Sequence, residues 1–257
     1  MEGLKDKTFL VTGIANKRSI AYAIAKKLTD SGARVALTYL PLEKENGEEK
    51  IRKVAGDLNP EMVLPLDASK EESITALMAA LGDRFGHLDG LVHSIASAKR
   101  GELGGRFSDI TPDGYQFAHL VSSYSLISLT RHAKPLMQGG GSVITLTYLG
   151  AERAVANYNV MGSAKAALEA NVRYLAMELG ESSIRVNAVS AGPIRTLASA
   201  GVKDFIELLR EARERAPLRR NVELEEVANV SGFLLSPLSS GMTGQVVYVD
   251  CGYNIAG

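Results

Sequence analysis

Residues 147–165 read Thr-Tyr-Leu-Gly-Ala-Glu-Arg-Ala-Val-Ala-Asn-Tyr-Asn-Val-Met-Gly-Ser-Ala-Lys, and they join two patterns that together indicate an α/β fold. They follow the apolar run 142–146, which is typical of a strand, and they open the Ala-rich stretch 164–179, which is typical of a long helix. Open α/β folds with parallel strands bind their ligands at the carboxyl ends of the strands. The stretch therefore indicates where a functional site would lie.

Two tyrosines and one lysine give this stretch its chemistry. Lys165 follows Tyr158 by seven residues, and seven helical residues turn about 700°, about 20° short of two full turns. A helix that begins at or just before Tyr158 would carry both side chains on one face. A tyrosine hydroxyl can donate to a developing oxyanion, and a nearby ammonium typically lowers its pKa by roughly 1–3 units. The pair suits a reduction in which hydride reaches carbon and negative charge builds on oxygen.

The alternative interpretation is structural. Tyr148 and Tyr158 would fill the core or the surface, and Lys165 would lie on a solvated helix face. An isolated tyrosine and lysine at helical spacing would favour that view. Their position between a strand and a long helix favours a catalytic pair instead.

The composition narrows the class of protein. The chain has 257 residues, of which 46% are hydrophobic and 23% charged, as in ordinary soluble globular proteins. Its formal net charge is zero, which argues against nucleic acid or an anionic membrane as the main partner. The single cysteine, Cys251, excludes an intrachain disulfide. The polar residues 1–7 and the lack of a long apolar run predict a cytoplasmic protein.

Short β-branched runs alternate with helical patterns along the whole chain. Strands are predicted at Thr8–Thr12, Arg34–Tyr39, Met62–Leu66, Leu88–Ser94, Ser142–Thr147, Ile184–Ser190 and Gln245–Val249. Helices are predicted at Ile20–Asp30, Glu71–Phe85, Tyr115–Met137, Tyr158–Leu179, Lys203–Arg215 and Leu224–Leu235. This alternation predicts an α/β Rossmann fold with a doubly wound, seven-stranded parallel sheet in the order 3-2-1-4-5-6-7. No linker divides it, so residues 1–257 are predicted to form a single dinucleotide-binding and catalytic domain.

The first predicted strand ends in Thr-Gly-Ile-Ala-Asn-Lys-Arg-Ser-Ile-Ala, residues 12–21, where a Rossmann fold places its phosphate loop. The loop is not a GxGxxG motif, because Gly13 is its one glycine and Ser19 and Ala21 stand near the later glycine positions. Taken alone it could be a plain turn between strand and helix. Its place after the first strand of an alternating chain favours a dinucleotide site.

Two further strand ends support this site. Asp67 follows the third predicted strand and could accept a hydrogen bond from the adenine amino group. Residues 94–96, Ser-Ile-Ala, follow the fourth strand, which neighbours the first in the predicted order. The gap between the first and fourth strands is the topological switch point, where such folds bind ligands.

Together these residues resemble the short-chain dehydrogenase/reductase superfamily, and more closely the NADH-dependent enoyl-acyl-carrier-protein reductases of bacterial type II fatty-acid synthesis. The resemblance covers nearly the whole chain and is most specific over residues 147–165, 168–174 and 185–198. Most members of the superfamily space the tyrosine and the lysine four residues apart. The gap of seven here is the enoyl reductase pattern, and it separates a C=C reductase from the commoner carbonyl reductases.

The resemblance implies a role for each matching position. Tyr158 would hydrogen-bond the thioester carbonyl and stabilise the enolate. Tyr148 would line the acyl pocket as a second active-site tyrosine, and Ala98 would lie beside the acyl chain. Lys165 would hold the nicotinamide ribose hydroxyls. The implied cofactor-binding residues are Gly13, Ser19, Ile20, Leu40, Asp67, Ala68, Ile95, Lys165, Ile194, Arg195, Thr196, Leu197 and Ala198.

A segment near 194–206 is predicted to cover the substrate. It begins just after Gly192-Pro193, and its small residues would anchor it weakly, while its apolar residues could cover an acyl chain. A fixed helix packed on the core is the alternative.

The cofactor follows from the end of the second strand. The family often carries glutamine there, whereas this chain has Leu40 and Pro41. An enzyme that uses NADPH would need arginine or lysine to meet the 2′-phosphate, and none occurs there before Lys44. The sequence therefore favours NADH.

Three other features of the sequence indicate a function less strongly. Cys251, where glycine or alanine would be usual, is interpreted as a small buried residue. The histidines show no ligand spacing, so no metal is predicted. A basic cluster is interpreted as a solvated helix face, with docking of an acidic acyl carrier protein as the alternative. The cluster consists of Arg210, Arg213, Arg215, Arg219 and Arg220.

The sequence thus predicts an NADH-dependent enoyl reductase that takes the enoyl thioester of acyl carrier protein. By resemblance it would assemble as a homotetramer. Two alternatives stay open. A 3-ketoacyl or other carbonyl reductase of the same superfamily is opposed by the seven-residue spacing and by Tyr148. A non-catalytic nucleotide-sensing protein is opposed by the presence of both Tyr158 and Lys165.

Overall fold

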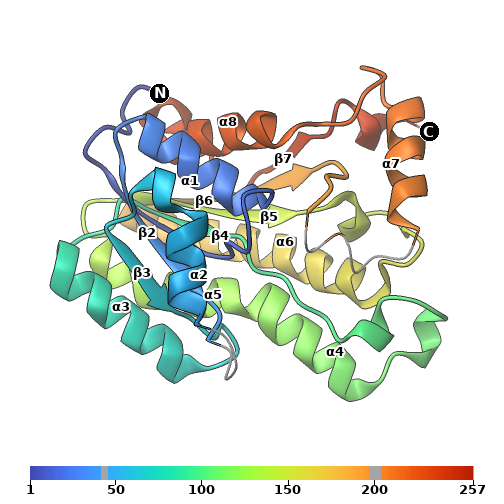
Figure 1. Ribbon diagram of the computed structural model, residues 1–257, viewed down its shortest axis with the longest axis horizontal. Helices are drawn as coiled ribbons and strands as arrows, with labels where there is room; N and C mark the ends of the chain where they lie inside the picture. The colour runs from blue at the N-terminus through green and yellow to red at the C-terminus, as the bar shows by residue number, and fades with distance from the viewer. Residues whose placement is uncertain (42–45, 197–198, 200–203, 257) are drawn as a thin grey trace.

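The computed structural model describes residues 1–41, 46–196, 199 and 204–256. In this part of the chain, parallel strands form one seven-stranded sheet in the order β3-β2-β1-β4-β5-β6-β7 (Figure 1). The strands are β1 (Thr8–Val11), β2 (Arg34–Tyr39), β3 (Met62–Pro65), β4 (Gly90–His93), β5 (Gly141–Thr147), β6 (Ile184–Ala191) and β7 (Val246–Val249). The predicted doubly wound fold and strand order are confirmed.

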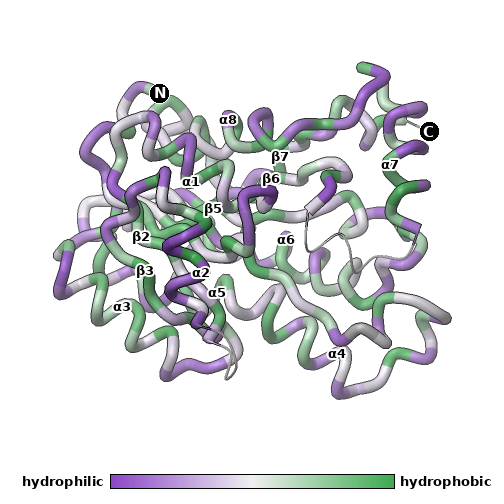
Figure 2. Tube along the Cα trace, viewed as in Figure 1, coloured by the Kyte–Doolittle hydropathy of each residue, from purple (hydrophilic) through white to green (hydrophobic). Residues whose placement is uncertain are grey.

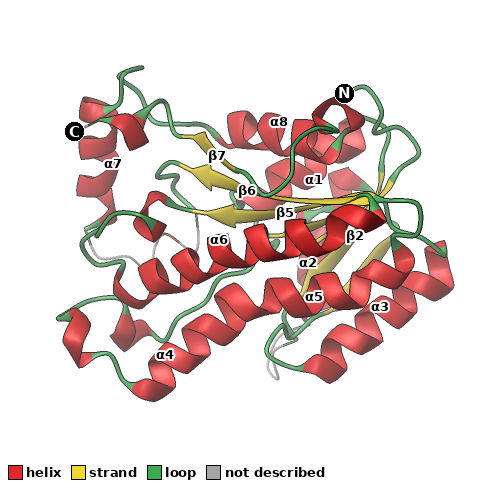
Figure 3. Cartoon of the chain, turned by 180° about the vertical axis from the view of Figure 1, so that it is seen from behind, coloured by secondary structure: helices red, strands yellow, loops and turns green. Residues whose placement is uncertain are grey.

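Helices cover both faces of the sheet. They are α1 (Ile20–Asp30), α2 (Gly47–Val54), α3 (Glu71–Phe85), α4 (Pro112–His119), α5 (Ser125–Ala133), α6 (Asn159–Leu179), α7 (Phe205–Arg215) and α8 (Leu224–Leu235). Helices α1, α2 and α8 lie on one face, and α3, α5 and α6 lie on the other, as the two opposite views show (Figures 1 and 3). No helix in the described part of the chain combines the length and the apolar character that crossing a bilayer requires.

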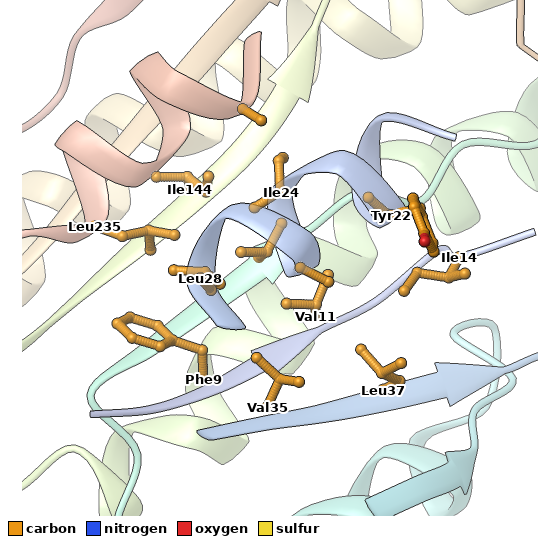
Figure 4. Packing of buried hydrophobic residues seen from close by; sticks show 14 of the residues in the cluster. Phe9, Val11, Ile14, Tyr22, Ile24, Leu28, Val35, Leu37, Ile144 and Leu235 are labelled. Atoms are coloured by element: carbon orange, nitrogen blue, oxygen red, sulfur yellow. The ribbon is translucent and has the colours of Figure 1, made fainter. Parts of the chain in front are cut away.

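Each face of the sheet has its own apolar core. Phe9 and Val11 of β1 pack with α1 and α8, as Figure 4 shows for Ile24, Leu28 and Leu235. The intervening strand residue, Leu10, belongs to the opposite core against α3, α5 and α6. This alternation follows from the two-residue period of a strand, and strands buried on both faces read as continuous apolar runs. In Figure 2 the green of hydrophobic residues is concentrated along the central strands.

The predicted helix Tyr115–Met137 differs from the observed structure. The helix begins earlier, at Pro112, because the Thr111 hydroxyl caps it by accepting a hydrogen bond from Gly114 N at 3.0 Å. A π-helical turn, Leu120–Tyr124, then separates α4 from α5. Next to this turn, the Ser125 hydroxyl donates to the carbonyl of Val121, one turn back, at 2.6 Å. The sequence pattern predicted one uninterrupted helix because the apolar spacing is the same with or without one wider π-helical turn.

Helix α2 was not predicted. It carries Asn46 as a capping residue, whose side chain accepts from Glu49 N, and Ile51 is its one fully buried apolar side chain. Most of its surface is charged, so no apolar stripe marks it as a helix.

A buried histidine ties the strands to the helical layer beneath them. His93 ends β4, and its Nδ1 and Nε2 atoms lie 2.8 Å from the hydroxyls of Thr145 and Ser125. Burial, and then the charge of Lys165, lower the pKa of this imidazole to about 3. His93 is therefore neutral in the folded protein at physiological pH.

We expect this histidine to make the protein sensitive to acid. The unfolded chain takes up a proton near the ordinary histidine pKa, whereas folded His93 resists protonation until about pH 3. The free energy of unfolding should therefore fall as pH drops from about 6.5, by up to about 1.4 kcal/mol per pH unit. His93→Asn should show a shallower decline than the wild type in urea unfolding at several pH values. Only slopes are compared, because the substitution lowers stability at every pH. Parallel slopes would contradict a neutral His93.

Candidate active site

The predicted site residues gather where the strands end. The arrowheads of β5, β6 and β7 point toward α7 (Figure 3), and the segments that follow the seven strands share this edge because all strands are parallel. The edge has two functional ends. The residues after β1, β2, β3 and β4 suit a dinucleotide, and those after β5 and β6 suit the reacting groups.

Gly13 allows the first loop to lie close to β4. Its φ is +86°, in the left-handed region, and a Cβ added there would collide with the carbonyl oxygen of Ser94. The Thr12 hydroxyl next to it donates to Val92 O at 2.9 Å and accepts from Ser94 N at 3.2 Å. The loop after β1 and the segment after β4 thus meet at the predicted switch point.

The start of α1 suits an anion. Ser19 is its N-cap residue and Ile20 its first residue, yet the Ser19 side chain caps no helix N–H and donates instead to Asn16 O at 2.7 Å. The first turn of α1 contains no acidic residue. Free N–H groups and the positive end of the helix dipole therefore face the loop without a protein carboxylate to neutralise them.

Leu40, Asp67 and Ala68 lie together after β2 and β3, which pair in register through Tyr39 and Pro65. Leu40 is 56% exposed, while Ala68 is buried. Burial alone would raise the pKa of Asp67, but hydrogen bonds from Ser69 and the Lys70 ammonium lower it below its usual range. An ionised carboxylate at this strand end can accept a hydrogen bond from a nucleoside.

The segment after β4 carries Ile95 and Ala98, both partly buried. It is fastened to the helical layer by Ser122 of the π-helical turn. The Ser122 hydroxyl accepts from Ser97 N at 2.9 Å and donates to Ser97 O at 3.0 Å. The π-helical turn therefore lies directly behind the predicted cofactor and acyl positions, as such turns often do at functional sites.

Tyr148 and Tyr158 form an edge-to-face pair, with ring centroids 5.0 Å apart. A Cβ added to Gly150 would collide with the Tyr158 ring, so this glycine lets the two rings approach. Tyr148 packs in a small apolar cluster with Leu149 and Tyr253. Its hydroxyl is buried and has no hydrogen-bond partner among the described residues, as expected for a group kept for a ligand.

The backbone on both sides of Tyr158 is strained. Asn157 and Asn159 have φ values of 60° and 26°, and the Asn159 side chain donates to Gly104 O and Gly105 O at 3.1 and 3.2 Å. Asparagine tolerates such angles better than most residues, and strained residues of this kind cluster at functional sites. Helix α6 begins at Asn159, so Tyr158 is its N-cap residue and not its first helical residue.

Lys165 of α6 is buried against the end of β5. Its Nζ donates to the carbonyl of Leu146 at 2.7 Å. Burial lowers the pKa of this ammonium to about 8. Burial, and to a smaller extent the neighbouring Tyr148, raise the pKa of Tyr158. The expectation of a lowered tyrosine pKa is therefore wrong, because desolvation raises it.

The segment after β6 is described in part. Ile194 is partly buried, Arg195 is exposed, and Thr196 N donates to the Ser199 hydroxyl at 2.8 Å. The predicted cofactor residues Leu197 and Ala198 lie outside the described residues, and so do residues 200–203 of the predicted substrate-covering segment. That segment stays a prediction.

The structure describes the residues behind the three other sequence features. Cys251 is half-buried with φ 59°, and burial raises the pKa of its thiol, as expected for an unreactive residue. In the basic cluster, Arg210, Arg215 and Arg220 pair with glutamates. Within the described residues, no three histidine, cysteine, aspartate or glutamate side chains gather in a way that could hold a metal ion.

Sequence reasoning missed two polar residues at this edge. Thr12 joins the ends of β1 and β4, and Glu169 accepts a hydrogen bond from the Thr147 hydroxyl at 2.6 Å. Glu169 stands four residues after Lys165, on the same helix face, which is the signal that could have found it.

The donor set fits a nicotinamide dinucleotide. Gly13 and the start of α1 would hold the pyrophosphate, and the ends of β2 and β3 the adenosine. Lys165 has two ammonium protons beyond the one given to Leu146 O, which would hold ribose hydroxyls. The fold and this site define an oxidoreductase of the short-chain dehydrogenase/reductase type.

Comparison with known proteins specifies the family. Residues 13–254 match the profile of the family described as Enoyl-(Acyl carrier protein) reductase. The NADH enoyl-acyl-carrier-protein reductase FabI of Nostoc sp. is 51% identical over 257 residues, covering 100% of both chains. The enzyme of Bacillus cereus, in a crystal structure with NADP+ and indole naphthyridinone, superposes with a TM-score of 0.96 at 49% identity over 100% of both chains. The chain belongs to the enoyl-acyl-carrier-protein reductase family.

The predicted family and activity are thereby confirmed over both alternatives: the chain is an enoyl-acyl-carrier-protein reductase of fatty-acid synthesis. Its cofactor is a nicotinamide dinucleotide, NADH or NADPH. The relatives differ on this point, since the FabI of Staphylococcus aureus, 48% identical over 256 residues and 99% of each chain, is named for NADPH.

Proposed function

We propose that this edge of the sheet reduces the trans-2 double bond of enoyl thioesters with NADH, and that Tyr158, Lys165 and Tyr148 carry the reaction. The observation that supports the assignment best is the edge-to-face pair of Tyr148 and Tyr158 at the end of β5. Two tyrosines side by side offer one hydroxyl to the thioester carbonyl and a wall for the acyl chain. Ala98, after β4, lies beside that chain.

Tyr158 stabilises the developing enolate. When bound, the reduced cofactor supplies the hydride for the β-carbon of the enoyl group. Negative charge then moves to the thioester oxygen, and the Tyr158 hydroxyl donates a hydrogen bond to it. Burial raises the pKa of Tyr158, so the hydroxyl remains protonated and available as a donor. Protonation at the α-carbon completes the saturated acyl chain.

Lys165 orients the cofactor. Its backbone contact with Leu146 O fixes the ammonium at the end of β5, and its remaining protons hold the ribose hydroxyls. Gly13, Ser19, Ile20, Leu40, Asp67, Ala68 and Ile95, with Ile194 to Ala198, complete the proposed cofactor contacts.

The substrate class can be tested directly. Loss of NADH absorbance should follow addition of crotonyl thioester and should not follow addition of acetoacetyl thioester. A C=C reductase needs an oxyanion donor at the thioester oxygen, whereas a carbonyl reductase places its donor at the ketone. Turnover of the ketone at a comparable rate would contradict the proposal.

Tyr158→Phe keeps the ring and removes the donor. Losing one oxyanion donor should lower kcat by roughly 10²- to 10³-fold, while NADH affinity stays close to that of the wild type. Steady-state kinetics with crotonyl thioester measure the first effect and fluorescence titration the second. Tyr115→Phe, at a residue 43% exposed on α4, is the matched control and should leave both unchanged. A fully active Tyr158→Phe variant would transfer the role to Tyr148.

NADH is the proposed cofactor because Leu40 and Pro41 place no cation at the end of β2. We expect kcat/KM to be higher with NADH than with NADPH. Leu40→Arg should raise kcat/KM for NADPH by roughly tenfold or more through a charge-assisted hydrogen bond to the 2′-phosphate. Leu40→Gln, a neutral side chain of similar length, should not. A wild-type preference for NADPH would refute the assignment.

The proposal extends to assembly and location. We propose that residues 1–257 act as one catalytic domain, in a cytoplasmic homotetramer. Exposed apolar side chains on α6, with Tyr174 at 77% and Met177 at 84% exposure, support contact with a second copy. Light scattering at several concentrations tests the assembly.

A further inference from the structure

Glu169 is a buried carboxylate that the proposed chemistry does not use. Its residue is 6% exposed, on the face of α6 that packs against the sheet. Glutamate is almost never buried to this degree without a partner. Its partner is the hydroxyl of Thr147, which donates to Oε1 at 2.6 Å.

Helix α6 therefore holds the end of β5 at two consecutive residues. Lys165 Nζ donates to the carbonyl of Leu146 at 2.7 Å, and Glu169, one helical turn later, accepts from Thr147. Side chains four residues apart lie on the same helix face, so both bonds form together. Tyr148 is the residue that directly follows these two attachment points in the chain.

The two α6 side chains also carry opposite buried charges. Burial lowers the pKa of Lys165 to about 8, and the carboxylate of Glu169 opposes that fall. The group that faces Lys165 from β4 is His93, which is neutral because its pKa is about 3. Glu169 itself faces Glu152 from the loop after β5, Tyr248 from β7 and Arg173 from α6.

Burial has the largest effect on the Glu169 carboxyl, so its pKa lies above its ordinary value. Burial raises the pKa of its carboxyl, and the hydrogen bond from Thr147 and the charges of Arg173 and Lys165 act in the opposite direction. Tyr248 has a hydroxyl that burial keeps protonated, and Glu152 would only add negative charge. Glu169 is thus a carboxylate one helical turn from Lys165, and it is attached to the β5 residue next to the one that Lys165 contacts.

We propose that Glu169 is a positioning residue: its carboxylate keeps Lys165 in the charged form that holds the ribose, and it anchors Thr147 so that Tyr148 stays in place. This inference rests on the role proposed above for Lys165. Removing the negative charge favours the neutral amine, so the lysine loses its proton at a lower pH. A neutral amine attracts ribose hydroxyls less strongly than an ammonium.

The test separates charge from anchoring with two variants of the full chain. Glu169→Gln removes the charge and keeps an acceptor for Thr147. Thr147→Val removes the hydrogen bond and keeps both charges. For each, the NADH dissociation constant is measured by fluorescence titration between roughly pH 6 and 10, across the titration range of a buried lysine. KM for crotonyl thioester is measured at neutral pH.

In the wild type, the dissociation constant should rise at alkaline pH as Lys165 loses its proton. In Glu169→Gln the midpoint of that rise should move down by about one pH unit. Thr147→Val should keep the wild-type midpoint and show a raised KM for the thioester, because Tyr148 is less well held. Lys165→Arg should abolish the alkaline rise, since its guanidinium stays protonated.

An identical midpoint in wild type and Glu169→Gln would overturn the counter-charge, and an unchanged KM in Thr147→Val would overturn the anchor. Should Glu169→Gln fail to fold, Glu169→Met replaces the carboxylate by an uncharged side chain of similar length, and a wild-type midpoint in that variant overturns the counter-charge as well. Failure of the proposed function shows differently. If Lys165→Ala leaves NADH affinity unchanged at neutral pH, the role of Lys165 is wrong, and the inference falls with it.

Discussion

The hydrogen bond from the Lys165 ammonium to the carbonyl of Leu146 joins α6 to the central sheet, beside the apolar side chains by which the helix packs there. A lysine can be buried only where its charge finds partners, and here the strand end supplies one. The bond ties the 21-residue helix to β5, and Tyr158 and Tyr148 lie at the same strand end. The parallel sheet then brings the loops after β1 and β4 to the same edge.

Burial favours the proposed role of Tyr158 and opposes the proposed role of Lys165. Desolvation disfavours the charged form of any group, so it keeps the tyrosine protonated and moves the lysine toward the neutral amine. The first effect suits an oxyanion donor. The second works against a cation that must hold a ribose, and a carboxylate one turn away offsets it. The water-excluded site thus needs a countering charge that an exposed site would not.

Much of the fold could be predicted from the sequence because its signals are local. The two-residue and 3.6-residue periods located all seven strands and helices such as α1, α3 and α8. Helix α2 was missed because Ile51 is its one fully buried apolar side chain. The π-helical turn was missed because the hydrogen bond from Ser125 to the Val121 carbonyl beside it leaves no mark in the apolar spacing. The pattern also placed Tyr148 after β5 and Lys165 on the helix that follows. The contact between Glu169 and Thr147 arises from the packing of α6 on β5, which the pattern does not give.

The spacing of Tyr158 and Lys165 pointed to this pair by a helix geometry that the structure does not show. A seven-residue gap would put both side chains on one helix face, but Tyr158 stands before the first turn of α6. Its place is set instead by the left-handed Asn157 and Asn159 around it, by Gly150 beneath its ring, and by the bonds of Asn159 to the Gly104–Gly105 backbone. A regular helix would hold the tyrosine at a fixed angle to the lysine. The strained turn frees it to face Tyr148 across the end of β5, where a thioester would lie between the cofactor and the two rings.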